Sequence, residues 1–234
     1  MIAAAPPHAS LVASPAHIVL APGDRRLVHV GATGGGQRVV VTATVAGFAL
    51  DLRGRPKIAR AGDAASWLVV APRRLRLGRG GGVISIRSRS PAHATPGDHS
   101  ALVLLTTSRT TARGVLVRMR IGLTVSVRIP GRLVHRLLIR RVRVRRQGVR
   151  RTLEISCANG GNVIEHVNGG VLRITLMKHG RPVGRWKPAR RDLLPHSTGL
   201  FSFGVPRRLR GAVIARVELQ RAGTHTVRRF RLRL

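Results

Sequence analysis

Alternation of apolar and polar residues with a period of two is the feature that most limits how this chain can fold. Every second residue from Val39 to Val45 is a valine or an alanine, and the run 115–129 alternates in the same way. This spacing predicts strands that bury one face of a sheet. Helical runs of a dozen or more residues are hard to place anywhere, so the pattern predicts an all-β chain.

Glycine and proline interrupt these runs at short intervals. Turns are predicted at Pro22–Asp24, 34–36 and Pro96–Gly97, because proline presets φ and glycine accepts positive φ. The first half then contains roughly eight strands and the second about seven, which is the spacing of β-sandwiches. The run 101–107 is apolar throughout and is expected to be a central strand.

The 234 residues are enough for one large domain or two ordinary ones. Pro130-Gly131 is the candidate boundary, because a long strand ends there and the strand pattern then starts again. We expect residues 1–9 to be a signal-peptide remnant or a disordered N-terminus, 10–130 to be the first sandwich and 131–234 the second. The alanines and prolines of the first residues look like the tail of a signal peptide, which predicts export.

The cores are expected to be aliphatic. Hydrophobic residues make up 43% of the chain, whereas aromatic residues make up 3% and tyrosine is absent. Valine, leucine, isoleucine and alanine must therefore fill the interior. Cys157 is the single cysteine, so the sequence has no disulfide framework and no CxxC motif. Its apolar neighbours predict a buried core residue.

Arginine dominates the charge. Lysine and arginine number 43 against 8 aspartates and glutamates, for a formal net charge of +35. One interpretation is a polyanionic partner: nucleic acid, an acidic cell-wall polymer or anionic lipid. The other is that arginine occupies solvent-facing positions throughout the chain. The even spread of the arginines favours the second interpretation.

The densest basic run, 140–146, predicts a strand with two different faces. Val142 and Val144 would lie on one face of this strand, and the arginines between and beside them would lie on the other. The candidate contacts for a polyanion or another partner are Arg141, Arg143, Arg145 and Arg146. Similar alternation recurs in 74–77 and 229–234, which favours a solvated sheet face over a dedicated site.

Catalytic signatures are missing from the sequence. It contains no Gly-x-Ser-x-Gly, P-loop or HExxH motif. The few carboxylates are expected mostly in turns, and the adjacent pair Asp98-His99 is interpreted as a turn cap. Scarce aromatics argue against stacking platforms for bases, and no apolar run reaches the roughly 18 residues of a membrane helix. We predict a non-enzyme with no cofactor, no metal, no small-molecule substrate and no transmembrane segment.

Several segments resemble a known family. The run Ser14–Asp24 is similar to the opening of the PapD-like, immunoglobulin-type domains of bacterial envelope proteins, and 67–72 and 91–99 resemble later parts of that domain. In the second half, Ile155–Val163 resembles a strand–turn–strand element of immunoglobulin-like modules in surface proteins. The wider group includes pilus chaperones and WxL-associated modules.

The resemblance implies two tandem immunoglobulin-like β-sandwich domains that act outside the cytoplasm. The implied function is binding, scaffolding or chaperone-like assembly in the cell envelope, with an extended peptide or an acidic surface as partner. An exposed edge strand would be the contact. Pilus chaperones hold a subunit's terminal carboxylate with particular basic residues, and no particular arginine here matches them. The alternative function is polyanion binding driven by the net charge.

Overall fold

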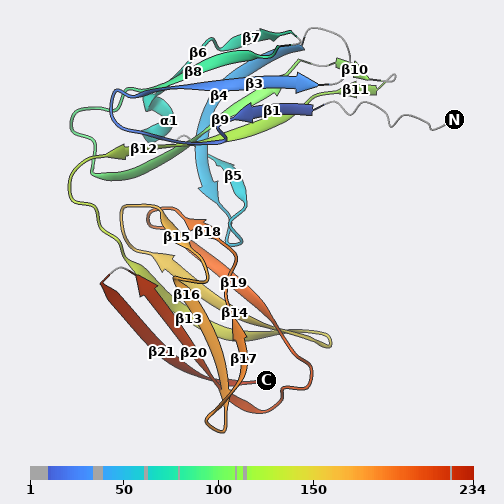
Figure 1. Cartoon of the computed structure of the whole chain (residues 1–234), viewed down its shortest axis with the longest axis vertical. Coiled ribbons are helices and arrows are strands. Elements are labelled where there is room, and N and C mark those ends of the chain that lie inside the picture. The colour runs from blue at the N-terminus through green and yellow to red at the C-terminus, as the bar shows by residue number, and fades with distance from the viewer. Residues whose placement is uncertain are drawn as a thin grey trace, which may run out of the picture. The chain divides into compact units, whose positions relative to one another are not determined.

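The computed structural model describes residues 10–33, 39–60, 63–78, 80–108, 110–112, 115–221 and 223–234. The chain divides into two compact units, Met1–Ala49 with Lys57–Arg132 and Leu50–Pro56 with Leu133–Leu234. Strands build both units (Figure 1), which confirms the all-β class. The predicted N-terminal remnant, residues 1–9, and the turn predicted at 34–36 lie outside the described residues.

The first unit contains a four-stranded sheet with the order β1-β3-β8-β6. Neighbouring strands in this sheet are antiparallel. The chain leaves the sheet between β1 and β2, at Ser14–Pro15, whose peptide bond is cis. The strands are β1 (Ser10–Ser14), β3 (Arg25–Thr33), β6 (Leu68–Ala71) and β8 (Gly82–Ser88).

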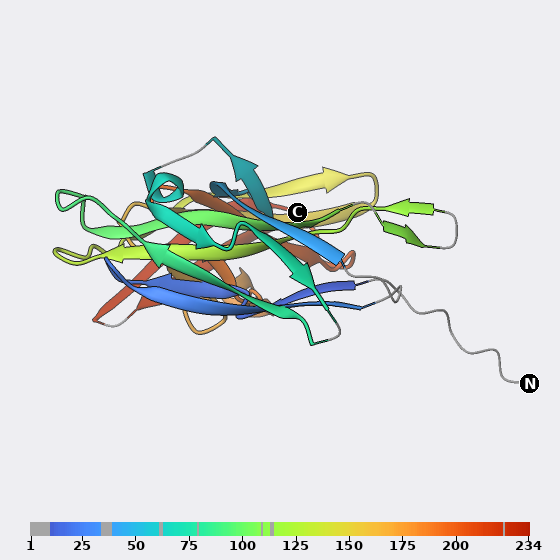
Figure 2. The same ribbon diagram turned by 90° about the horizontal axis from the view of Figure 1, so that it is seen from above.

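The larger sheet of this unit has the order β2-β12-β9-β4-β5, and β7 pairs with β4. Figure 2 shows β9 and β12, in two shades of green, side by side. The predicted central strand is confirmed, because β9 lies between β12 and β4 and is largely buried. The strands are β2 (His17–Leu20), β4 (Val39–Leu50), β5 (Pro56–Ala59), β7 (Arg74–Leu77), β9 (Gly97–Thr107) and β12 (Arg120–Ile129), with the separate hairpin β10 (Thr110–Ala112) and β11 (Val115–Val117).

An aliphatic core fills this unit, as the composition predicts. Val39, Val41 and Ala43 are buried on one face of β4, in agreement with the period of two. Trp67 ends the short helix α1 (Asp63–Trp67), and the strand β6 begins at the next residue. Burial of Ala64 and Trp67 in the core holds this single turn in place.

The described residues of the second unit form three sheets, with the orders β13-β14-β19, β15-β18 and β17-β16-β20-β21. Their strand pairs are all antiparallel. The strands are β13 (Leu137–Gln147), β14 (Arg150–Asn159), β15 (Glu165–Val167), β16 (Leu172–Lys178), β17 (Arg181–Trp186), β18 (Arg191–Leu193), β19 (Thr198–Val205), β20 (Ala212–Arg221) and β21 (Thr224–Arg233).

Cys157 lies in the core of this unit with no exposed surface, which confirms the prediction of a buried core residue. Burial disfavours the charged thiolate and raises the pKa of Cys157 to about 12. Leu153 and Ile155 lie four and two residues before it on the same inward face of β14. The thiol therefore acts as a small apolar group.

The turn at 159–162, within the run that resembles a strand–turn–strand element, is built around a buried amide. The Nδ2 atom of Asn159 donates to the carbonyl oxygens of Val163, Leu193 and Leu194, and its Oδ1 atom accepts from the backbone N–H of Gly161. A Cβ atom at Gly161 would overlap the carbonyl oxygen of Val134. Only glycine fits that close approach.

The carboxylates do not mostly occupy turns, contrary to the sequence-based expectation. Asp98, Glu154 and Glu165 lie within strands and are buried. Burial of a charged group requires a partner, and each of the three carboxylates has a cationic side chain beside it. Part of the arginine content therefore neutralises carboxylates that would otherwise be buried without a counter-ion.

Candidate functional site

One half of β12 is a free sheet edge in the described part of the chain. On one side, β12 pairs with β9 along its whole length, from Arg120 to Ile129. On the other side, β2 pairs with it only from Thr124 to Val127. Residues 120–123 thus have no neighbouring strand on the β2 side among the described pairings. A free edge of this kind is where an extended segment can add to a sheet.

The direction of the backbone groups follows from two hydrogen bonds. The carbonyl oxygen of Met119 accepts from Thr107, towards β9, whereas the N–H of Thr124 donates to Ala16, towards β2. Successive residues of a strand direct these groups to opposite sides. The N–H and C=O groups of Arg120 and Gly122 therefore face the free edge.

The side chains of this segment alternate between the core and solvent. Met119 and Ile121 are half-buried and pack on the first unit's core, and Leu123 is buried within it. Arg120 and Gly122 are exposed. A Cβ atom at Gly122 would meet only the side chains of β9, at ordinary contact distances of 3.5 Å and beyond. The edge is thus apolar on one face and lacks a side chain at one of the two outward positions.

The far end of β12 is fixed to β9 by an ion pair. Arg128 and Asp98 face each other in the β-sheet register. Nε of Arg128 donates to Oδ1 of Asp98 at 2.6 Å and its Nη2 to Oδ2 at 2.8 Å. The hydrogen bond to Asp98 raises the pKa of the Arg128 guanidinium. This bidentate contact holds the register of the strand whose other end is free.

The predicted pair Asp98-His99 therefore has a structural role, although it is not a turn cap. Asp98 is in β9 and binds Arg128. His99 points elsewhere: its Nε2 lies 2.8 Å from the carbonyl oxygen of Thr95, and its ring lies 4.7 Å from the ring of Trp67 between centroids. The two side chains do not converge on a common site.

The predicted basic contacts all lie on β13. Val142 and Val144 face inward while Arg141, Arg143 and Arg145 are exposed, which confirms the predicted alternation. Arg143 faces Glu154 in the register with β14 and donates to it at 2.8 Å, and Arg145 lies 3.8 Å from the same carboxylate. Glu154 thus offsets part of the charge of this run. Arg146 is exposed near the end of the strand.

Other kinds of site are not evident in the described residues. No group of three or more histidine, cysteine, aspartate or glutamate side chains there could hold a metal ion. No helix in these ranges is long and apolar enough to cross a membrane.

The free half of β12 was not identified from the sequence, which treated 115–129 as one strand. The structure divides that run into β11 and β12, with Arg118 and Met119 between them. Gly122 was the available signal, since an isolated glycine within a strand pattern indicates a bulge or a close backbone approach.

The fold and its free edge define the chain as a two-domain β-sandwich of the kind that can accept an extended strand. No family model and no curated protein matches its sequence. Solved structures match over nearly the whole chain. The class 5 fimbriae chaperone CfaA is 14% identical, with a TM-score of 0.54 over 94% of this chain and 98% of the chaperone.

Two further structures give the same result. A chaperone–tip adhesin complex of CFA/I fimbriae biogenesis matches with a TM-score of 0.53 and 14% identity, over 94% of this chain and 98% of that one. The CsuC–CsuE chaperone–tip subunit complex of Acinetobacter baumannii matches with a TM-score of 0.50 and 12% identity, over 95% and 98%. The chain therefore has the PapD-like fold of pilus chaperones, with two immunoglobulin-like sandwiches.

Proposed function

We propose that this protein is an extracytoplasmic, non-catalytic chaperone that binds an extended segment of a surface-fibre subunit. The bound segment adds as a strand to the free half of β12. The observation that carries the proposal is the unequal pairing of β12, complete towards β9 but limited to Thr124–Val127 towards β2.

The free edge provides both affinity and selectivity for an extended chain. Arg120 and Gly122 offer two N–H and two C=O groups, and each hydrogen bond contributes a net ~0.5–1.5 kcal/mol. Four such bonds do not outweigh the cost of ordering a flexible segment. Apolar side chains of the partner must therefore also be buried, and the half-buried Met119 and Ile121 are the adjacent apolar surface.

The similar structures support the same function. Two of them are complexes of a chaperone with a tip subunit, and the Csu complex is described as a pre-assembly complex.

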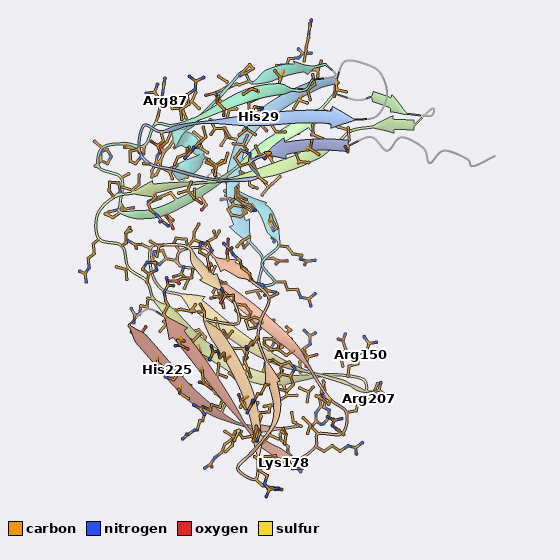
Figure 3. All side chains as sticks on the ribbon, in the orientation of Figure 1. His29, Arg87, Arg150, Lys178, Arg207 and His225 are labelled. Atoms are coloured by element: carbon orange, nitrogen blue, oxygen red, sulfur yellow. The ribbon has the colours of Figure 1, made fainter. Side chains whose placement is uncertain are left out.

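The test uses a backbone change at one edge residue. Gly122→Pro removes an N–H that faces the free edge and not β9, so the ladder of the sheet is retained while a partner strand is blocked. Gly122→Ala keeps the N–H and makes only ordinary contacts, and is the matched control. A photo-reactive amino acid at Arg120 reports the partner, and the same probe at Arg150, exposed at the β13–β14 turn (Figure 3), is the control position.

In cells of the native host, we expect position 120 to crosslink a discrete exported protein through an extended segment. Gly122→Pro should abolish that adduct, and Gly122→Ala should retain it. Equal crosslinking at positions 120 and 150, or adducts that survive Gly122→Pro, would contradict strand addition at β12.

Polyanion binding is the second candidate function, supported by the net charge of +35. Its predicted contacts are Arg141, Arg143, Arg145 and Arg146. Substitution of exposed Arg141 and Arg146 by glutamine should then weaken nucleic-acid binding and lower its salt dependence. Unchanged binding by this variant would assign the affinity to the general charge of the surface.

A further inference from the structure

The outer face of the sheet β17-β16-β20-β21 carries an unusual row of cationic side chains. On β20, Ile214 and Arg216 face outward, because Val213 and Ala215 are buried. Their partners on β21 are Arg231 and Arg229. Arg216 and Arg229 therefore stand directly opposite each other, and like charges in that position destabilise a sheet.

A groove runs along this face. Its volume is about 460 Å³, within the roughly 300–1,000 Å³ of ordinary ligand sites. Its apolar surface includes Met177 and Ile214, which are cross-strand partners. Ile214 is 41% exposed, so its side chain is accessible from the groove.

Cations surround this apolar floor. Arg216, Arg229 and Arg231 line the groove together with Lys178, which projects from the end of β16 (Figure 3). None of the described lining residues is an aspartate or glutamate. Glu218 lies on this same face, with Oε1 3.3 Å from Nε of Arg216 and Oε2 3.5 Å from Nε2 of His225. One carboxylate does not neutralise the four cations.

We propose that this groove binds a single-chain anionic amphiphile. The alkyl chain lies against Met177 and Ile214, and the carboxylate or phosphate head is held by Arg229 and Arg231. The guanidinium group forms paired hydrogen bonds with either kind of head. An anion there also relieves the repulsion between Arg216 and Arg229.

The combination of an apolar floor and cationic walls selects this occupant. A polyanion would form ion pairs with the arginines, and it would leave the apolar side chain of Ile214 exposed. A neutral lipid would contact the apolar floor, and it would leave the like charges of Arg216 and Arg229 opposite each other without a counter-ion. A second copy of this chain is disfavoured, because each copy carries a formal charge of +35. The groove also lies on the face of the sheet and not at its edge, so it does not depend on strand addition at β12.

Isothermal titration with octyl phosphate, kept below its micelle concentration, tests the proposal on the full chain. Inorganic phosphate, octyl glucoside and polyglutamate serve as comparison ligands. The variants are Arg229→Gln with Arg231→Gln, and Ile214→Gln. The matched control is Arg140→Gln with Arg150→Gln, which removes the same charge from exposed positions on β13 and β14 of the same unit.

We expect saturable one-to-one binding of octyl phosphate, weakened about tenfold or more by the Arg229/Arg231 pair of substitutions and unchanged by the control. Ile214→Gln should weaken binding of octyl phosphate and leave that of inorganic phosphate unchanged. Arg229→Gln alone should raise the melting temperature, because it removes the opposed charge, and this shows that the variant is folded.

Other outcomes would overturn the proposal. An equal loss in the control variant would assign binding to bulk charge. Equal affinity for octyl glucoside would show that the arginines do not take part. Equal affinity for inorganic phosphate or polyglutamate would show that the alkyl chain adds nothing and that the site is one for anions alone.

Discussion

Removal of the Arg128 side chain should destabilise the first unit more than removal of the charge of Asp98. The Asp98 side chain has no exposed surface, whereas that of Arg128 is 48% exposed. Arg128→Met leaves a buried carboxylate without the two bonds to the guanidinium. Hydrogen bonds to charged groups contribute about 1.5–3 kcal/mol each. Partial exposure of the arginine favours the lower value, so we expect a loss of roughly 3 kcal/mol in the free energy of unfolding.

Asp98→Asn should lower the free energy of unfolding by less, roughly 1 kcal/mol. The Arg128 guanidinium that loses its partner is half exposed and is readily hydrated. The two substitutions share one interaction, so the double variant should lose less than the sum of the single losses. The two single substitutions differ in their expected loss of stability because Asp98 is buried and Arg128 is half exposed.

The two tryptophans allow each unit to be followed separately. Trp67 lies in the first unit and Trp186 in the second. Urea unfolding in a Trp186→Phe background reports the first unit through Trp67, whose ring contacts His99 next to Asp98. In a Trp67→Phe background, Arg128→Met should leave the unfolding midpoint of the second unit unchanged. Equal costs for the two single substitutions, or a cost of Arg128→Met below about 1 kcal/mol, would refute the reasoning.

The Cys157 thiol, whose pKa burial raises to about 12, should not react with an alkylating reagent at pH 8 until the protein unfolds; mass spectrometry along a urea series would show this, and rapid labelling of native protein would contradict it. Asn159→Ala should lower the free energy of unfolding by roughly 3 kcal/mol, because it orphans several buried groups; urea unfolding followed by Trp186 is the measurement. Hydrogen bonds from the Arg55 backbone and side chain lower the pKa of Asp51 from 3.8 to about 2. The turn at Asp51 should therefore keep its full stabilisation above pH 3.8 and lose it as the pH falls towards 2, as NMR titration of the carboxyl would show; a midpoint near 3.8 would argue against these bonds. Residues 131–234, the predicted second domain, should unfold cooperatively when expressed alone, and a gradual transition in calorimetry would contradict the proposed boundary.

Local pattern was sufficient for much of the architecture. The alternation in 39–45 predicted the inward face of β4, and the apolar run 101–107 predicted a central strand. The burial of Cys157 was predicted correctly from its neighbours. These features depend on residues that are close in sequence, because strand periodicity and turn chemistry are local properties.

The candidate sites required information that is not local. The period of two shows which side chains face the core, and it does not show which strand lies beside a given edge. The limited pairing of β2 with β12 joins residues more than a hundred positions apart in the sequence. In the same way, the partners of Arg143 and Arg128 became visible only when the strands were in register.

The sequence by itself determined the class of this protein: short amphipathic strands, aliphatic cores and a strongly basic surface. The tertiary structure alone decided which edge is free, which arginines are neutralised by buried carboxylates, and which stand opposed around an apolar groove. The physical reason is that each of these depends on strand neighbours and register, which are fixed by contacts between distant parts of the chain.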